Sequence, residues 1–180
     1  MTGEQLHRHY LELCSNLVKM YEERGLLWSA TPEKAAEAME KCDGNDNRGL
    51  EELNERISWT KERLGKLREV AKAINESLKL EVVAEECGLS EIEKDMLIVL
   101  LMKDAEPRCS GRQTYPTAAD LLRLFYRYDF EILEARRLLY PDARLRRNNL
   151  LIVEDYAESV LCCTFRLAEQ TIRRLLEHDV

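Results

Sequence analysis

The apolar pattern changes from a helical to a strand period between residues 115 and 167, and this change restricts the fold more than any other feature. Two short amphipathic patterns with helical spacing come first, opening at Thr117 and at Asp129. An arginine-rich turn follows, and then an apolar run over residues 150–153. Residues 161–167 alternate apolar with polar side chains, which is the period of a half-buried strand. The order is therefore helix, helix, strand, strand.

A buried helix is predicted ahead of this segment, over residues 90–103. Ser90 and Glu93 have the spacing of a capping box, in which each side chain satisfies the backbone amide of the other residue. Apolar residues cover most of this helix, so we expect it to be the buried one. With this helix in front, the chain order is that of a winged-helix domain. We predict such a domain, with a small β-hairpin wing, over residues 81–180.

The helix that opens at Asp129 is predicted to be amphipathic and to extend to Tyr140. Asp129 is expected to cap it, and Pro141 to end it. The inward face is predicted to hold Phe130, Leu133 and either Leu138 or Leu139. The outward face is predicted to hold Glu131, Glu134, Arg136 and Arg137.

The N-terminal part carries two long helical patterns. Apolar or small residues alternate by three and four over four heptads, at Leu50, Leu53, Ile57, Thr60, Leu64, Leu67, Ala71, Ile74 and Leu78. This is the pattern of a coiled-coil seam. A similar stripe over residues 4–24 predicts a partner helix that ends at Gly25, with a short helix over 31–42 and a loop over 43–49 in between. We predict a helical hairpin with coiled-coil character over residues 1–80; pairing of residues 50–78 between two chains is the alternative.

The charge balance argues mildly against non-specific binding to nucleic acid. The 180 residues include 34 acidic and 27 basic side chains, a net charge of −7, whereas the phosphate backbone favours cationic surfaces. Residues 123–147 are locally basic, with seven basic and four acidic side chains. The predicted partner-binding residues of this region are Arg136, Arg137, Arg144, Arg146 and Arg147.

Two interpretations of Arg144, Arg146 and Arg147 remain open. Arginines at a wing tip can lie along a phosphate backbone. Alternatively, they sit in a solvated turn and pair with carboxylates such as Glu154 or Asp155. The helix that would enter the major groove exposes acidic residues and has no Asn or Gln for a base edge. We therefore favour internal pairing or a protein partner over DNA.

No pattern in the chain predicts catalysis, a cofactor or a metal site. The phosphate-binding motif G-x-x-x-x-G-K-[ST] and the nucleophile motif G-x-S-x-G do not occur. His7 and His9 are two residues apart on a predicted helix, so they point to different faces and do not share a metal. Cys162 and Cys163 are neighbours on a predicted strand, which places one thiol in the core and one at the surface. We expect a protein that is not an enzyme.

The cysteines and the apolar runs indicate a cytoplasmic protein. The six cysteines show neither a C-x-x-C pair nor the spacing of a disulfide framework, which predicts free thiols. No apolar run approaches the about 20 residues that span a bilayer. The first residues also lack the apolar segment of a secretory signal.

Four segments of the chain carry a family resemblance: residues 89–102 (LSEIEKDMLIVLLM), 116–125 (PTAADLLRLF), 135–153 (ARRLLYPDARLRRNNLLIV) and 165–176 (FRLAEQTIRRLL). Together they resemble the winged-helix domain found N-terminal to the ATPase module in a group of bacterial AAA-family ATPases. Asn149 stands where glycine is usual in that group. The resemblance implies a non-catalytic N-terminal module that recognises a substrate or adaptor protein, or that regulates the chain's own downstream ATPase module.

Two other functions remain open at this point. The first is a winged-helix transcription regulator that binds DNA and dimerises through the helix over residues 50–78. Its wing and docking helix would have to be net basic, and acidic residues interrupt them here. The second is a purely structural oligomerisation segment, which is favoured if the heptads pair between chains.

Overall fold

The computed structural model describes residues 2–29, 46–105 and 115–176. The chain forms two compact units, residues 1–74 and residues 75–180. The helix predicted over residues 31–42 lies outside the described residues. Where the structure describes the chain, it is mainly helical with one small antiparallel sheet, which confirms the predicted fold class.

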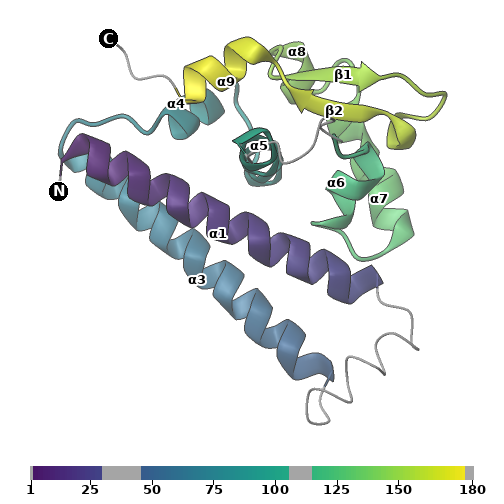
Figure 1. The fold of residues 1–180 in the computed structure, drawn as a ribbon, viewed down its shortest axis with the longest axis horizontal. Coiled ribbons are helices and arrows are strands. Elements are labelled where there is room, and N and C mark those ends of the chain that lie inside the picture. Colours follow the sequence, from purple (N-terminus) through teal and green to yellow (C-terminus); the bar gives the residue numbers. More distant parts are fainter. Residues whose placement is uncertain (1, 30–45, 106–114, 177–180) are drawn as a thin grey trace. The chain divides into compact units, whose positions relative to one another are not determined.

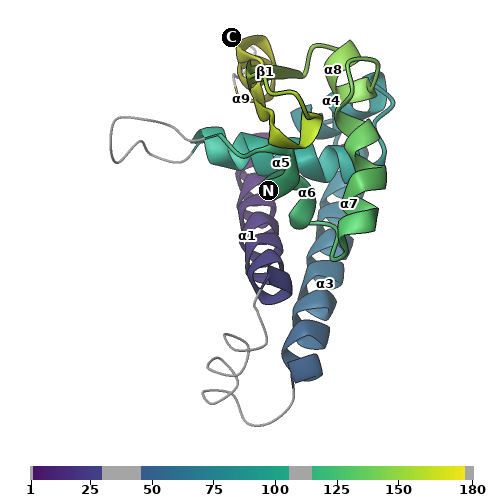
Figure 2. The ribbon, with the colours of Figure 1, turned by 90° about the vertical axis from the view of Figure 1, so that its right-hand side faces the viewer.

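The first unit is a helical hairpin. Helices α1 (Gly3–Ser29) and α3 (Asp46–Ala73) lie side by side and run in opposite directions (Figures 1 and 2). The hairpin is therefore present as predicted. Two helix ends differ from the prediction, because α1 continues through Gly25 to Ser29 and α3 already begins at Asp46, inside the predicted loop.

The predicted seam of α3 forms the core of the hairpin over most of its length. Leu53, Ile57, Thr60, Leu64 and Ala71 are buried in α3, and α1 contributes Leu6, Tyr10, Leu13, Leu17 and Tyr21. The prediction of an unbroken seam to Leu78 is wrong. Helix α3 ends at Ala73, Asn75 adopts a left-handed backbone with φ 54°, and Ile74 is 45% exposed. A left-handed residue just after a helix ends it, because it turns the next amide out of the helical ladder.

The second unit contains six α-helices among its described residues. They are α4 (Lys79–Glu86), α5 (Glu91–Ala105), α6 (Ala118–Arg123), α7 (Asp129–Ala135), α8 (Arg144–Arg147) and α9 (Glu169–Leu176). Two short 3₁₀ turns, η1 (Arg136–Leu139) and η2 (Val160–Cys162), complete the helical elements.

Two antiparallel strands form the wing. Strand β1 (Leu151–Asp155) pairs with β2 (Thr164–Leu167), so that Leu151 lies opposite Leu167 and Val153 opposite Phe165 (Figure 1). On the other edge of β2, Thr117 forms a single bridge with Thr164. The predicted β-hairpin is confirmed, although the second strand begins at Thr164 because residues 160–162 form η2.

Helix α5 begins at the predicted capping box. The Ser90 amide donates to Glu93 Oε2 at 2.8 Å, and the Glu93 amide donates to Ser90 Oγ at 3.4 Å. Every residue from Glu93 to Leu101 is buried, so α5 supplies much of the core, as predicted from its apolar surface. A second capping box, between Thr117 and Asp120, opens α6 as predicted.

Two glycines provide a matched test of this backbone description. A Cβ added at Gly65 in α3 or at Gly88 after α4 would meet no atom within 4 Å, but Gly88 has φ +62°. Gly65→Ala should therefore stabilise its helix by about 0.5–1 kcal/mol. Gly88→Ala should destabilise the protein by about 1–2 kcal/mol, since alanine meets a steric penalty in the left-handed region.

Denaturant unfolding separates the two effects. The chain has two tryptophans, Trp28 and Trp59, and both belong to the first unit, so their fluorescence follows that unit. Gly65→Ala should raise the fluorescence midpoint, whereas Gly88→Ala should lower the midpoint of the circular dichroism transition. Equal effects of both substitutions would contradict the assigned helix end at Gly88.

Candidate functional site

The structure places the three arginines of the predicted wing tip outside the wing. Arg144, Arg146 and Arg147 form the short helix α8, which precedes β1, whereas the connection between the two strands spans residues 156–163. The prediction of wing arginines is therefore wrong in position. Leu145 is fully buried and anchors this turn in the core, and Asn149, with φ 54°, ends it.

Arg144 forms an internal ion pair. Its guanidinium lies 2.9 Å from Glu93 Oε2, and the Glu93 side chain is 3% exposed. The same carboxylate oxygen accepts hydrogen bonds from the Ser90 amide and hydroxyl. Arg144 thus neutralises a buried carboxylate at the start of α5 and holds α8 against it. Asn148, at the end of α8, adds a hydrogen bond from Nδ2 to the carbonyl of Cys87.

Arg146 is also used inside the domain. Its guanidinium donates to the carbonyl of Leu139 at 3.4 Å and lies 6.0 Å from the ring centroid of Phe165. These two contacts tie α8 to η1 and to β2. Arg146 is half-buried, so a partner would have to displace these contacts to use its charge.

Arg136, Arg137 and Arg147 are exposed. The first two lie in η1, because the predicted helix to Tyr140 is α-helical only from Asp129 to Ala135. The structure therefore divides the five predicted partner-binding residues. Arg144 and Arg146 make contacts inside the domain, although the Arg144 side chain is still 50% exposed, whereas Arg136, Arg137 and Arg147 are exposed.

The sequence patterns did not predict an apolar patch on α7. Phe130 is 63% exposed, Leu133 is 49% exposed, and Tyr128, just before the helix, is 52% exposed. The inward orientation predicted for Phe130 and Leu133 is wrong, since Ile132, Ala135 and Leu139 are the buried residues. Phe130 and Leu133 have helical spacing, and so do Ile132, Ala135 and Leu139. The second set was the sequence signal that could have predicted the buried face, although its side chains are smaller.

Two aromatic residues of this patch are in contact. The rings of Tyr128 and Phe130 stack with centroids 5.7 Å apart, and the Arg127 guanidinium lies 5.6 Å from the Tyr128 centroid. Phe130 and Leu133 are three residues apart on α7 and share its outer face. We call Tyr128, Phe130 and Leu133 the α7 patch.

The start of α7 is held by an acidic side chain. Tyr128 occupies the N-cap position that the sequence assigned to Asp129, and its amide donates to Glu131 Oε2 at 3.1 Å. Burial raises the pKa of the neighbouring Tyr126 above its usual range; Glu131 adds to this effect and Arg137 opposes it. Glu131 therefore has a local structural role beside the patch.

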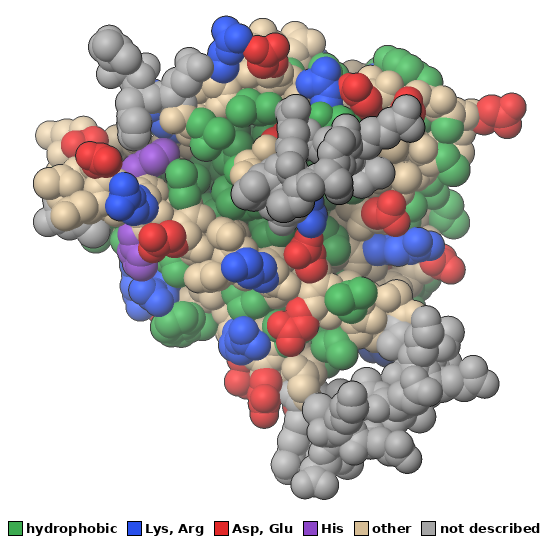
Figure 3. All heavy atoms as spheres, in the orientation of Figure 1, with side chains coloured by type: hydrophobic (Ala, Val, Ile, Leu, Met, Phe, Trp, Pro, Cys, Tyr) green, Lys and Arg blue, Asp and Glu red, His purple; other side chains and the backbone are tan. Residues whose placement is uncertain are grey.

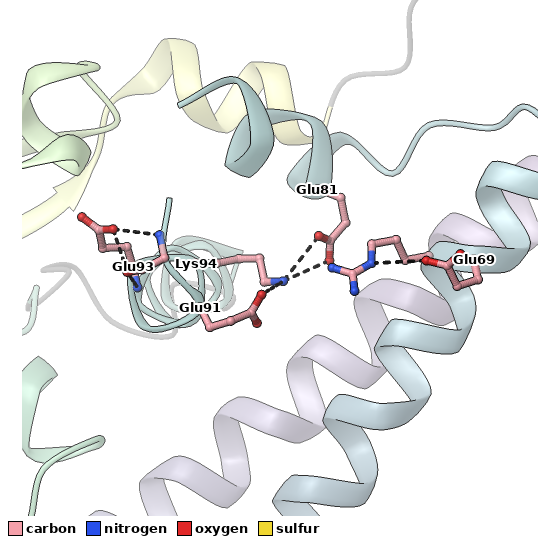
Figure 4. A network of polar contacts seen from close by, with 7 residues as sticks. Glu69, Glu81, Glu91, Glu93 and Lys94 are labelled. Carbon is pink, nitrogen blue, oxygen red and sulfur yellow. Dashed lines mark hydrogen bonds and ion pairs between the residues drawn. The ribbon is translucent and has the colours of Figure 1, made fainter. Parts of the chain in front are cut away.

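A cluster of three charged side chains, Glu81, Glu91 and Lys94, connects α4 and α5. Lys94 Nζ lies 3.4 Å from Glu81 Oε2 and 3.2 Å from Glu91 Oε1, and the Lys94 and Glu81 side chains are 11% and 12% exposed (Figure 4). Figure 4 also shows Glu93 and Lys94 pointing away from one another. The lysine is paired with two carboxylates, so the group is suited to holding the helices together.

The connection at the wing is acidic. Tyr156 is 80% exposed, and Asp155 and Glu158 flank it. Arg166 on β2 pairs with Glu154 on β1, so the basic side chain of the wing is already neutralised. On the face drawn in Figure 3, acidic and basic side chains of the described residues are interspersed rather than gathered by sign.

Among the described residues, potential metal ligands are scattered and the cysteines are free thiols. The described residues contain no cluster of three potential metal-binding side chains. Cys162 is exposed and Cys163 is 5% exposed, which confirms the predicted division into a surface and a core thiol. Burial raises the pKa of the Cys87 thiol, with Arg174 opposing and Glu86 adding to the effect, and this disfavours the reactive thiolate. None of the described helices has both the length and the apolar character needed to cross a membrane.

Comparison with known proteins identifies the fold. A family model described as "Winged helix domain, variant" matches residues 7–180. No curated protein and no solved structure matches the chain.

The division of the arginines predicts a clear difference in stability. Arg144→Ala leaves the buried Glu93 carboxylate without its cation and should destabilise the second unit by about 1–3 kcal/mol. Arg147→Ala, on the same short helix but exposed, should change stability by less than about 0.5 kcal/mol. Urea unfolding followed by circular dichroism measures both. Equal stability of the two variants would show that the Arg144–Glu93 pair contributes nothing.

Proposed function

The chain belongs to the winged-helix domain family in its variant form, and we propose that it is a non-catalytic module that binds a protein partner through α7. The α7 patch is the single observation that carries this proposal. Phe130 and Leu133 lie on α7 and Tyr128 at its N-cap, and α7 corresponds in chain order to the helix that enters the major groove in a DNA-binding winged helix.

The composition of the patch favours a protein. Two stacked aromatic rings and a leucine stand at least 49% exposed next to Arg127. Aromatic residues and arginine are enriched at protein interfaces and supply most of their binding energy, whereas exposed leucine and phenylalanine add little to contacts with phosphates. Arg136 and Arg137 in η1 are exposed close by in the chain and suit the polar rim of such an interface.

Electrostatics disfavour duplex DNA at the same surface. Helix α7 carries Asp129, Glu131 and Glu134, and the wing carries Asp155 at the end of β1 and Glu158 in its connection. These carboxylates would face phosphates if the domain docked in the usual orientation, and like charges there reduce affinity. Arg144 is 50% exposed but its charge is paired with Glu93, and Arg146 is half-buried against the Leu139 carbonyl, so less unpaired positive charge is left for phosphates.

The class of partner follows from the resemblance to the N-terminal domains of bacterial AAA-family ATPases. We propose that the α7 patch contacts a substrate or adaptor protein of such a motor, or the chain's own downstream ATPase module. This part of the proposal is supported by the sequence motifs alone. A phosphate-binding motif in the coding region that follows residue 180 would support it further, and its absence there would remove the intramolecular version.

Site-specific photocrosslinking tests whether the patch binds a protein. A photoreactive phenylalanine analogue at position 130 should yield a discrete crosslinked protein species in cells that naturally make this chain. The same analogue at position 156 is a matched control, because Tyr156 is an exposed aromatic residue on the acidic wing. Leu133→Asp should abolish the adduct at position 130 by placing a charge in the apolar contact.

The outcomes separate protein binding from DNA binding. An adduct at position 130 that is absent at position 156 and lost with Leu133→Asp supports the proposal. Equal adducts at both positions would contradict a specific patch. Saturable binding to duplex DNA at about 50 mM salt, lost with Arg136→Glu and Arg137→Glu, would favour the transcription regulator instead.

A further inference from the structure

Helix α3 exposes a tryptophan on a face that the hairpin does not use. Trp59 is 57% exposed, and the Arg63 guanidinium lies 4.7 Å from its ring centroid. The buried seam of the same helix passes through Ile57 and Thr60, on the side packed within the hairpin. A large exposed aromatic residue beside an arginine is typical of a binding hot spot.

Charges of opposite sign flank Trp59 in two rows. Glu55 and Glu62 are seven residues apart and form an acidic row along α3, whereas Arg56 and Arg63 form a basic row. Trp59 is three or four residues from all four, so it lies between the rows. The side chains at 55, 56 and 62 are exposed, and Arg63 is half-buried.

This arrangement is complementary to itself in one orientation. If two α3 helices lie side by side and parallel, related by a twofold axis along their length, Trp59 meets Trp59 of the other copy. The acidic row of each helix then faces the basic row of the other, with Glu55 level with Arg56 and Glu62 level with Arg63. An antiparallel pair would place acidic row against acidic row and basic against basic.

We propose that this face, centred on Trp59, binds a second copy of the chain and forms a parallel, twofold-symmetric dimer. The surface differs from the α7 patch in residues and in unit, so it does not depend on the proposed protein partner. It also differs from a dimer through the heptad seam, whose residues pack inside the hairpin.

The dimer should be weak and sensitive to salt. The central contact is one tryptophan pair over roughly three helical turns, well below the about 1,600 Å² buried in a typical stable complex. The flanking ion pairs are largely exposed and lose strength as salt screens them. The second copy also competes with polar contacts inside the hairpin. Arg56 lies 3.9 Å from Glu23, Glu62 lies 2.6 Å from Lys66, and Arg63 lies 3.3 Å from His9 Nε2. We therefore expect reversible association in the micromolar range, which sedimentation velocity detects from about 5 µM to about 500 µM.

Charge exchange at one level of the interface is the decisive experiment. In Glu55→Arg the new arginine faces Arg56 of the other copy, and in Arg56→Glu two glutamates face each other. Each variant alone should dimerise about tenfold more weakly than the natural chain. In an equimolar mixture, each arginine of the Glu55→Arg chain faces a glutamate of the Arg56→Glu chain, so the natural affinity should be recovered. Recovery in the mixture also shows that neither variant is misfolded.

Two further variants complete the test. Trp59→Ala should weaken dimerisation, whereas Lys72→Glu, a charge reversal on the same helix but on another face, should leave it unchanged. Stronger association of Glu55→Arg alone would overturn the parallel arrangement in favour of an antiparallel one. A natural chain that stays monomeric at about 500 µM, or single variants that dimerise as well as it does, would overturn the proposal.

Discussion

The second unit depends on the interactions of one buried group, the Glu93 carboxylate. It is almost completely buried, yet it serves three partners: the Ser90 amide, the Ser90 hydroxyl and the Arg144 guanidinium. A buried carboxylate is tolerated only when such partners replace its hydration. One side chain therefore opens the central helix α5, holds α8 against it, and so positions the chain that enters β1.

This requirement decides which charges are left for recognition. Arg144 is committed to Glu93, and Arg146 to the Leu139 carbonyl and the Phe165 ring. The region that is basic in sequence is consequently less basic at the surface. What stands out instead is the α7 patch, whose aromatic residues sit where a winged helix normally meets its ligand. In our proposal, this exposed aromatic surface is where the domain contacts a protein partner.

Features that depend on near neighbours in the chain were predictable. The capping boxes at Ser90 and Thr117 require only a spacing of three residues, and the hairpin follows from two matching stripes. The inward face of α7 was not predictable in the same way. Phe130 and Leu133 compete with Ile132, Ala135 and Leu139 at the same helical spacing, and the larger side chains are the exposed ones. Only packing against α6 and η1 selects between the two faces.

The sequence by itself therefore determined the order of the elements, the starts of α5 and α6, the hairpin and the wing, because each rests on local periodicity or a local hydrogen bond. The tertiary structure alone decided which arginines make contacts inside the domain and which face of α7 is buried. Both depend on contacts between residues far apart in the chain, such as the pairing of Arg144 with Glu93 across 51 positions. A local pattern cannot specify a partner that only folding brings into reach.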